Sequence, residues 1–451
     1  MTEWLDEIAE WLRIESVSAD PEHAADVLRA GEWARDFIRD AGGQAEIVDW
    51  HGQPLVVGEI RANVGAGDPS AGGLDATGET PTVLCYGHFD VQPADPIELW
   101  DSPPFEATVR GEYVYGRGVA DDKGQLYLLL AAARELARAG ELPVNVRFAL
   151  DGEEETGGHC IVELIEADDR GADAAIIFDS GMVARDVPAF AIATRGLVYF
   201  HLSVSTGTTD LHSGVYGGAA MNAAHVLIGA LAQLIAADGR LAEPLREGIV
   251  TPAEEELASW RELPAGASEL SDQGATPADP RAAEEFYIRT CAEPALDVNG
   301  IDSGSPYFEK TVLPVNAAAN VSIRLAPGQD PDTIAAAFER LLRDVVPAGA
   351  ELTIERTSSA EPGIVPPDSP AIRLAQDAFE DVLGVRPLLV RTGGSLPIVA
   401  ALAGRGIPAI ITGFSLPDAQ IHAPNERLLT EYVPKGIAAA RALFVALGGL
   451  A

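Results

Sequence analysis

Five side chains with nitrogen or oxygen donors are candidate metal ligands. They are His88, Asp121, Glu155, Asp179 and His422. Imidazole and carboxylate groups suit Zn²⁺, Mn²⁺ or Co²⁺, and none of the five carries sulfur. A single catalytic zinc takes three protein ligands and a water, so five ligands with one shared carboxylate would supply two metals. Asp121, which lies among glycines at a helix entrance, is the natural bridge.

Two further acids are expected to work beside these ligands. Glu154 adjoins Glu155 and is placed to take a proton from water and give it to a leaving amine. Asp90 follows His88 by two residues and is expected to hydrogen-bond the second imidazole nitrogen, which fixes the tautomer. Two metals about 3.5 to 4 Å apart favour attack of water on a carbonyl group. Amide hydrolysis is therefore the predicted chemistry, with an arginine to anchor a substrate carboxylate.

Each of these residues alone is weak evidence for a site. The chain has 69 acidic residues, and an arbitrary acid is usually a solvated surface group. Five other histidines lack any ligand context: His23, His51, His159, His201 and His225. Ser213 and Ser395 lie outside the nucleophile-elbow pattern, which disfavours a serine mechanism. The prediction rests on the whole set.

Short apolar segments precede three of the predicted functional positions. Residues 82–86 lead to His88, residues 144–150 lead to the acids around Glu155, and residues 174–178 lead to Asp179. Helical patterns alternate with these strands, which is typical of a mostly parallel sheet flanked by helices. Ligand-binding groups gather past the carboxyl ends of such strands. We therefore expect an α/β fold with the ligands along one edge.

The pattern changes after residue 195. Alternating residues 197–205, helical residues 331–345 and a strand pattern at 351–356 indicate a smaller α+β domain inserted into the first. Residues 251–306 are expected to be irregular, and residues 65–81 to form a solvated loop. The predicted division is a catalytic domain built from residues 1–195 and 361–451, with the inserted domain at 196–360 between these two segments.

Composition limits the partners of the chain. The 69 acidic residues against 31 basic ones give a net charge of −38, which disfavours nucleic acids and anionic membranes. The three cysteines are too few and too scattered for a disulfide framework. The N-terminus lacks the features of a signal peptide, and no apolar run is expected to reach the roughly 20 residues of a membrane span. These features predict a soluble cytoplasmic protein that acts on small molecules.

The motifs around the candidate ligands resemble a known family. They are Gly87-His88-Phe89-Asp90-Val91, Gly116-Arg117-Gly118 followed by Asp121-Asp122-Lys123-Gly124, Glu154-Glu155-Thr156-Gly157, and Asp179. Together they resemble the M20 metallopeptidases with two zinc ions, in particular the carnosinase-like dipeptidase branch. Residues 210–218, 322–325, 391–395 and 422–426 extend the resemblance over nearly the whole chain.

The resemblance implies a division of the ligands between the two metals. One metal would be held by His88, Asp121 and Asp179, and the other by Asp121, Glu155 and His422. Glu154 would be the general base. The resemblance also implies a cis peptide bond between Asp121 and Asp122.

The resemblance further implies a lid and a substrate site. The inserted domain would act as a lid and dimerisation domain, and His212 would reach the site of the partner subunit to polarise the scissile carbonyl. Arg324 and the backbone of Gly394 and Ser395 would receive the carboxylate of the substrate.

These inferences favour a cytoplasmic, homodimeric dipeptidase that uses two Zn²⁺ ions, or Mn²⁺ or Co²⁺, on short peptides with a free carboxylate. One alternative is an N-acyl amino-acid amidohydrolase, of the deacylase or desuccinylase type, with the same metals. A second alternative is a binding protein without catalysis on the same scaffold. The motif around His212 and the long 251–306 segment favour dipeptides.

Overall fold

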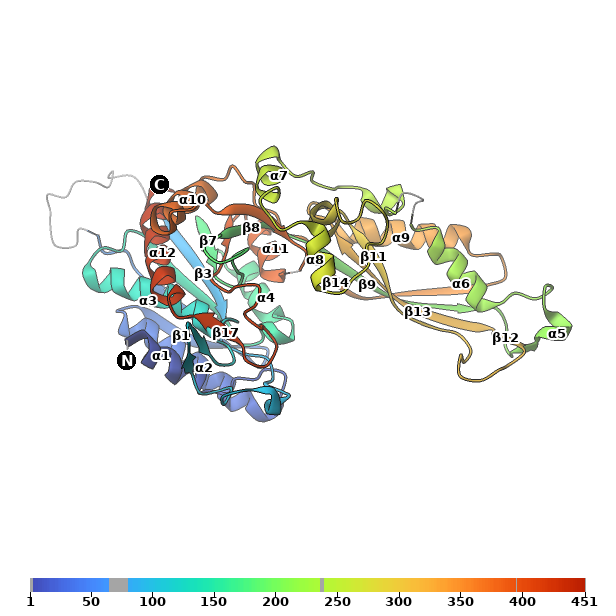
Figure 1. Cartoon of the computed structure of the whole chain (residues 1–451), viewed down its shortest axis with the longest axis horizontal. Coiled ribbons are helices and arrows are strands. Elements are labelled where there is room, and N and C mark those ends of the chain that lie inside the picture. Colours follow the sequence, from blue (N-terminus) through green and yellow to red (C-terminus); the bar gives the residue numbers. More distant parts are fainter. Residues whose placement is uncertain (1–2, 65–79, 236–238, 395, 451) are drawn as a thin grey trace.

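A computed structural model describes residues 3–64, 80–235, 239–394 and 396–450. An eight-stranded sheet forms the centre of the larger body (Figure 1). Its strands, in spatial order, are β1 (Gln44–Trp50), β2 (Gln53–Ile60), β6 (Asn145–Asp151), β3 (Thr82–His88), β7 (Ala174–Ile177), β16 (Ala409–Ile411), β8 (Ala189–Thr194) and β15 (Leu388–Thr392). β3 pairs in parallel with both β6 and β7, and β16 in parallel with β7. The strands predicted near 82–86, 144–150 and 174–178 are confirmed.

Helices cover this sheet. They are α1 (Glu3–Leu12), α2 (Ala24–Asp40), α3 (Lys123–Ala139), α4 (His159–Ala167), α10 (Pro370–Leu383), α11 (Pro397–Gly404) and α12 (Tyr432–Leu447). α3 is buried over most of its length because it packs against both α12 and the sheet. Its entrance requires glycine, since a Cβ at Gly124 would lie 1.9 Å from the carbonyl oxygen of Val119. The α/β fold with a mostly parallel sheet is thus confirmed.

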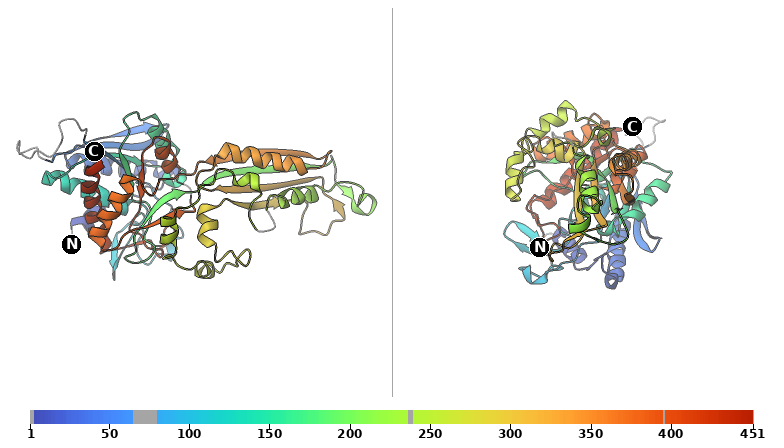
Figure 2. Two further views of the ribbon diagram at one scale, coloured as in Figure 1. Left: turned by 90° about the horizontal axis from the view of Figure 1, so that it is seen from above. Right: turned by 90° about the vertical axis from the view of Figure 1, so that its right-hand side faces the viewer.

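A second, antiparallel sheet forms a smaller body, and the molecule is elongated (Figure 2). Its order is β11 (Ala295–Asp302), β13 (Asn316–Leu325), β9 (Gly196–Ser205) and β14 (Glu351–Ala360). α6 (Ala223–Ala232) and α9 (Pro331–Val345) pack on this sheet, and Phe200 stacks on Phe338 with ring centroids 4.4 Å apart. At the far tip lie β10 (Leu211–His212), β12 (Val312–Leu313) and α5 (Ser213–Tyr216) (Figure 1).

The two bodies have separate hydrophobic cores. The larger core draws on residues between Ile8 and Ile192 and between Val365 and Leu447, whereas the smaller draws on residues between Val198 and Leu342. The domain boundaries at 195/196 and 360/361 remain a prediction. The predicted loop at 65–81 falls mostly outside the described residues.

The segment expected to be irregular contains regular elements, so that expectation was wrong. It includes α7 (Glu254–Trp260), α8 (Gly266–Asp272), a π-helix (Ile288–Ala292) and β11. α7 packs on β15, the edge strand of the larger sheet. Arg391 of β15 donates to both carboxylate oxygens of Glu256, at 2.6 and 3.1 Å, and both side chains are buried. The inserted segment therefore contacts the larger body through a buried ion pair.

The end of α12 also departs from expectation. Tyr432–Leu450, which includes α12 and the turn Gly448–Leu450, is long and apolar enough to cross a membrane by length and composition alone. The expectation that no such run exists was therefore wrong. Val433, Leu443 and Phe444 of this helix are buried in the larger core, which identifies α12 as a core helix.

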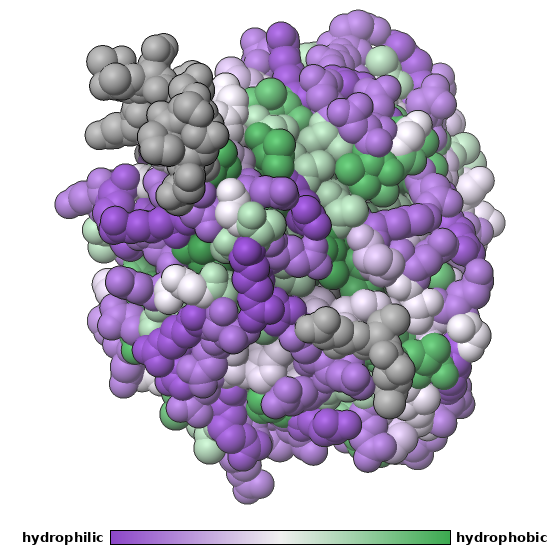
Figure 3. All heavy atoms as spheres, turned by 90° about the vertical axis from the view of Figure 1, so that its left-hand side faces the viewer, coloured by the Kyte–Doolittle hydropathy of each residue, from purple (hydrophilic) through white to green (hydrophobic). Residues whose placement is uncertain are grey.

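The face of the larger body away from the smaller one is mostly hydrophilic, with apolar residues gathered near its centre (Figure 3).

A small three-stranded sheet joins distant parts of the chain. Its order is β17 (Arg427–Leu429), β5 (Tyr113–Tyr115) and β4 (Thr108–Arg110). Arg427 pairs with Tyr115. This pairing brings the residues just before β17 beside the residues just after β5, and therefore brings His422 toward Asp121.

Candidate metal centre

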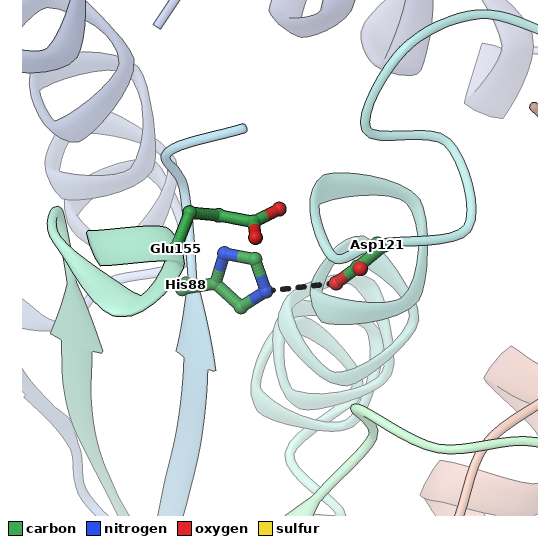
Figure 4. A group of neighbouring side chains, drawn as sticks. All are labelled: His88, Asp121 and Glu155. Atoms are coloured by element: carbon green, nitrogen blue, oxygen red, sulfur yellow. Dashed lines mark hydrogen bonds and ion pairs between the residues drawn. The ribbon is translucent and has the colours of Figure 1, made fainter. Parts of the chain in front are cut away.

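The candidate ligands gather at the ends of neighbouring strands. His88 ends β3 and lies opposite Asp151, which ends β6 in parallel register. Glu155 lies in the short 3-10 turn Glu154–Thr156 that follows β6, and Asp179 follows β7. His88, Asp121 and Glu155 come from three different segments and approach one another, with donor atoms within 4.8 Å (Figure 4).

Asp121 lies between two imidazoles. Its Oδ1 is 3.0 Å from Nε2 of His88, and its Oδ2 is 2.9 Å from Nε2 of His422. The same nitrogen of His422 is 3.1 Å from Oε2 of Glu155, and Nε2 of His88 is 3.9 Å from Oδ1 of Asp179. All five predicted ligands therefore lie in one cluster, with Asp121 at its centre. Their role as ligands remains a prediction.

The electrostatics of the cluster fit a divalent cation. Oε1 of Glu155 is buried and has no hydrogen-bond partner among the described residues. Burial, together with the nearby Asp121, Glu154 and Glu155 carboxylates, raises the pKa of Asp179 well above its ordinary value. Hydrogen bonds to Asp121 and Glu155 raise the pKa of His422 to about 10. The crowded carboxylates thus favour a positive charge between them, which a metal would supply.

Asp90 links the histidine to the neighbouring turn. Its Oδ1 is 3.3 Å from Nδ1 of His88, and its backbone oxygen is 3.1 Å from the same nitrogen. Its carboxylate also accepts hydrogen bonds from the backbone N–H groups of Glu154, at 3.3 Å, and Glu155, at 3.1 Å. One buried side chain therefore contacts both the ligand histidine and the residues that carry the candidate base. Burial raises the pKa of Glu154, and the charge of His88 acts in the opposite sense.

The carboxylate of Glu426, for which the sequence predicted no role, supports the loop that carries Asp121. Glu426 is fully buried and accepts 2.7 and 3.0 Å hydrogen bonds from Nη1 of Arg117 and the backbone of Gly118. Its other oxygen accepts from the backbone N–H groups of Ala120, at 2.8 Å, and Asp121, at 3.1 Å. The sequence feature that could have pointed to Glu426 is the position of an acidic residue four residues after His422.

The cis peptide bond predicted between Asp121 and Asp122 is present.

His212 does not join this cluster within its own chain. It ends β10 at the tip of the smaller body, where α5 begins, while β3 lies in the larger body (Figure 1). The side chain is exposed, and its Nδ1 accepts a 3.0 Å hydrogen bond from the backbone of Gly214. Arg324 lies on β13 and pairs with Leu197. Gly394 follows β15, and Ser395 lies outside the described residues.

Comparison with known proteins identifies the family. The model of a family described as peptidase family M20/M25/M40 matches residues 84–446, which include every candidate ligand. The chain belongs to this family. This M20 protein is therefore a hydrolase of the metallopeptidase class.

Several relatives resemble this M20 peptidase over most of their length. A human protein named Beta-Ala-His dipeptidase is 29% identical over 418 residues, which cover 88% of this chain and 80% of the relative. A Corynebacterium striatum protein named cysteinylglycine-S-conjugate dipeptidase is 29% identical over 429 residues, covering 93% and 90%. The solved structure of human carnosine dipeptidase 1 is 26% identical, with a TM-score of 0.72 and coverage of 99% and 96%.

A further solved structure shares the fold. The M20 metallo-carboxypeptidase Sso-CP2 from Sulfolobus solfataricus superposes with a TM-score of 0.80 at 24% identity. The superposition covers 99% of this chain and 100% of the other. Both bodies of the M20 peptidase thus belong to a fold already known.

Proposed function

We propose that this M20 peptidase is a dipeptidase that hydrolyses the amide bond of short peptides with a free C-terminal carboxylate. The observation that carries the proposal is the position of Asp121 between the imidazoles of His88 and His422. The relatives named as dipeptidases, which match over most of the chain, support the substrate class.

The proposed cofactor is a pair of Zn²⁺ ions, with Mn²⁺ or Co²⁺ as substitutes. His88, Asp121 and Asp179 would hold one ion, and Asp121, Glu155 and His422 the other. The distances around Asp121 support this division, because each of its oxygens faces a different histidine. When bound, the ions would supply the positive charge that polarises the scissile carbonyl and acidifies an attacking water.

The side chains around the ions perform the remaining steps. Glu154 takes the proton from the attacking water and delivers it to the nitrogen of the leaving amine. Asp90 fixes the tautomer of His88 through Nδ1 and holds the turn that carries Glu154. Glu426 fixes the backbone of Asp121 through two adjacent N–H groups. These contacts would hold the segments that carry the general base and the bridging carboxylate in place.

Substrate binding would use the smaller body as a lid and dimerisation domain. His212 lies where β10 meets α5, at the tip of the smaller body and away from the metal centre of its own chain (Figure 1). We therefore propose that it polarises the substrate carbonyl in the active site of the partner subunit of a homodimer. Arg324, Gly394 and Ser395 would receive the carboxylate of the peptide. We place this reaction in the cytoplasm.

A substrate panel tests the proposal. Metal-replete enzyme is assayed with dipeptides, the C-terminal amides of the same dipeptides, and N-acetyl and N-succinyl amino acids. We expect the highest kcat/KM for dipeptides with a free carboxylate. Faster cleavage of the N-acyl amino acids would favour an amidohydrolase instead. Protein that binds no metal and cleaves no compound of the panel would favour a binding protein.

A further inference from the structure

Gln92 lies in an extended segment that continues the chain beyond β3. The backbone N–H groups of Phe89 and Val91 each donate a 2.9 Å hydrogen bond to a neighbouring segment, and the side chains of both residues are buried. The proline that follows Gln92 also favours an extended backbone at this residue. Because side chains alternate along an extended chain, Gln92 lies on the same side of the segment as His88 and Asp90.

The side-chain amide of Gln92 contacts Glu155 at two points. Its Nε2 donates a 2.8 Å hydrogen bond to Oε2 of Glu155 and a longer one, of 3.4 Å, to the backbone carbonyl of the same residue. Asp90 accepts the backbone N–H of Glu155 at 3.1 Å. Two alternate residues of one segment therefore hold both the backbone and the carboxylate of this candidate ligand.

The two carboxylate oxygens of Glu155 have different surroundings. Oε2 lies 3.1 Å from Nε2 of His422 in addition to its bond with Gln92, whereas Oε1 is buried without a hydrogen-bond partner among the described residues. A carboxylate oxygen can accept two partners, so Gln92 occupies one position on Oε2 and leaves the other for an ion shared with His422. The last torsion of a glutamate side chain is broad, and without Gln92 the carboxylate could turn and present its oxygens differently.

We propose that Gln92 is a positioning residue that orients Glu155 for the metal ion that Asp121, Glu155 and His422 would hold. The inference rests on the proposed division of the ligands between two ions. Among the described residues, the side chain of Gln92 hydrogen-bonds Glu155 and none of the other four candidate ligands. Loss of this contact should therefore weaken the binding of one ion and spare the other.

Gln92→Met tests this role in two variants that each keep one ion. The methionine has a similar length but no hydrogen-bond donor. Asp179→Asn should retain the ion held by Glu155 and His422, and His422→Gln should retain the other ion. Metal-free full-length protein is titrated with Zn²⁺ in competition with a chromogenic chelator. We expect Gln92→Met to raise Kd about 10- to 100-fold in the Asp179→Asn chain and to leave Kd unchanged in the His422→Gln chain.

A second readout uses the otherwise wild-type chain. Gln92→Met should need about 10- to 100-fold more free Zn²⁺ for half-maximal hydrolysis of the best dipeptide of the panel. Saturating Zn²⁺ should restore kcat, because the ligands themselves are intact. A loss of kcat that added Zn²⁺ does not restore would place Gln92 in the chemical step and overturn the positioning role.

The control is Gln273→Met, which changes an exposed glutamine directly after α8 and should leave both Kd values unchanged. An equal rise of Kd in the two single-ion variants would mean that Gln92 only supports the surrounding fold, which overturns the inference. An unchanged Kd in both would overturn it as well and leave the metal centre standing. Wild-type protein that binds fewer than two Zn²⁺ ions per chain would instead contradict the proposed pair of ions.

Discussion

Nε2 of His422 lies 2.9 Å from Oδ2 of Asp121, although the two residues are far apart in the sequence. The small sheet that pairs Arg427 with Tyr115 brings their segments together. Because the other oxygen of Asp121 faces His88, this carboxylate is the only one of the five candidate ligands expected to contact both metals. We therefore expect that replacing different ligands of the cluster removes different numbers of metal ions.

The number of metal ions bound per chain should depend on whether Asp121 contacts both of them. We expect wild-type protein to bind about two Zn²⁺ per chain, His422→Gln about one and Asp121→Asn almost none, because only Asp121 serves both ions. Bound metal is measured by mass spectrometry after gel filtration. His225→Gln, which changes an exposed histidine on α6, should keep both ions. Retention of two ions by Asp121→Asn would show that it does not bridge.

Replacement of Glu154 should separate chemistry from metal binding. Glu154→Gln keeps the shape of the side chain but removes the proton acceptor, so we expect kcat to fall about 10²- to 10⁴-fold. Metal content and KM should change little. Glu166→Gln, an exposed glutamate on α4, serves as the control. Normal turnover by Glu154→Gln would assign the general base to another residue.

Mixed dimers test whether His212 acts in the partner subunit. His212→Ala and Glu154→Gln should each be nearly inactive as homodimers. A mixed dimer has one site with an intact Glu154 and a His212 from the other subunit, so random mixing should restore about a quarter of wild-type activity. Co-expression with two affinity tags allows the mixed species to be purified and assayed. A purified mixed dimer as inactive as its parents would reject the shared site.

The buried pair of Glu426 and Arg117 should matter for stability. Glu426→Gln removes the charge that faces Arg117, and we expect the free energy of unfolding to fall by about 3 kcal/mol. Glu431→Gln, which breaks a partly exposed pair with Arg185, should cost less than about 1 kcal/mol. Urea unfolding of both variants at pH 7 compares them. Similar losses in the two variants would mean that the buried pair has no special role.

We expect a pH-dependent contribution to the free energy of unfolding from Glu7, which lies where α1 contacts α3. Burial raises the pKa of Glu7, but hydrogen bonds from Arg134 and Tyr127 outweigh this effect, and the pKa is lowered from 4.5. A lowered folded-state pKa stabilises the protein above the unfolded-state pKa, and this stabilisation disappears as pH falls through the folded-state value. Glu7→Gln should therefore cost about 1 kcal/mol at pH 7 and progressively less below pH 4.5. Urea unfolding across this range measures the difference, and a cost independent of pH would contradict the expectation.

The sequence predicted several strands of the larger sheet and the gathering of the candidate ligands at its edge, because local patterns determine both. Apolar segments that end in His88 and Asp179 indicate buried strands, and parallel strands bring their ends to a common edge. β8 and β15 were not predicted, because neither strand leads to a candidate metal ligand.

The role of Glu426 could not be predicted because it depends on tertiary contacts. Glu426 acts on the backbone of residues 118–121, which the sequence places far away. Sequence spacing alone cannot show which backbone groups a buried carboxylate contacts.

The ion pair between Glu256 and Arg391 limits how the chain can be divided or recombined. A fragment of residues 196–360 made alone would expose Glu256 and Trp260, which are 2% and 8% exposed in the intact chain. The remaining chain would lose both the carboxylate that pairs with Arg391 and the helix α7 that packs on β15, whereas an insert that covers Arg391 without an acid would leave a buried charge unpaired, which is strongly destabilising. A chimaera that exchanges the insert with that of a relative must therefore exchange both partners of this pair together.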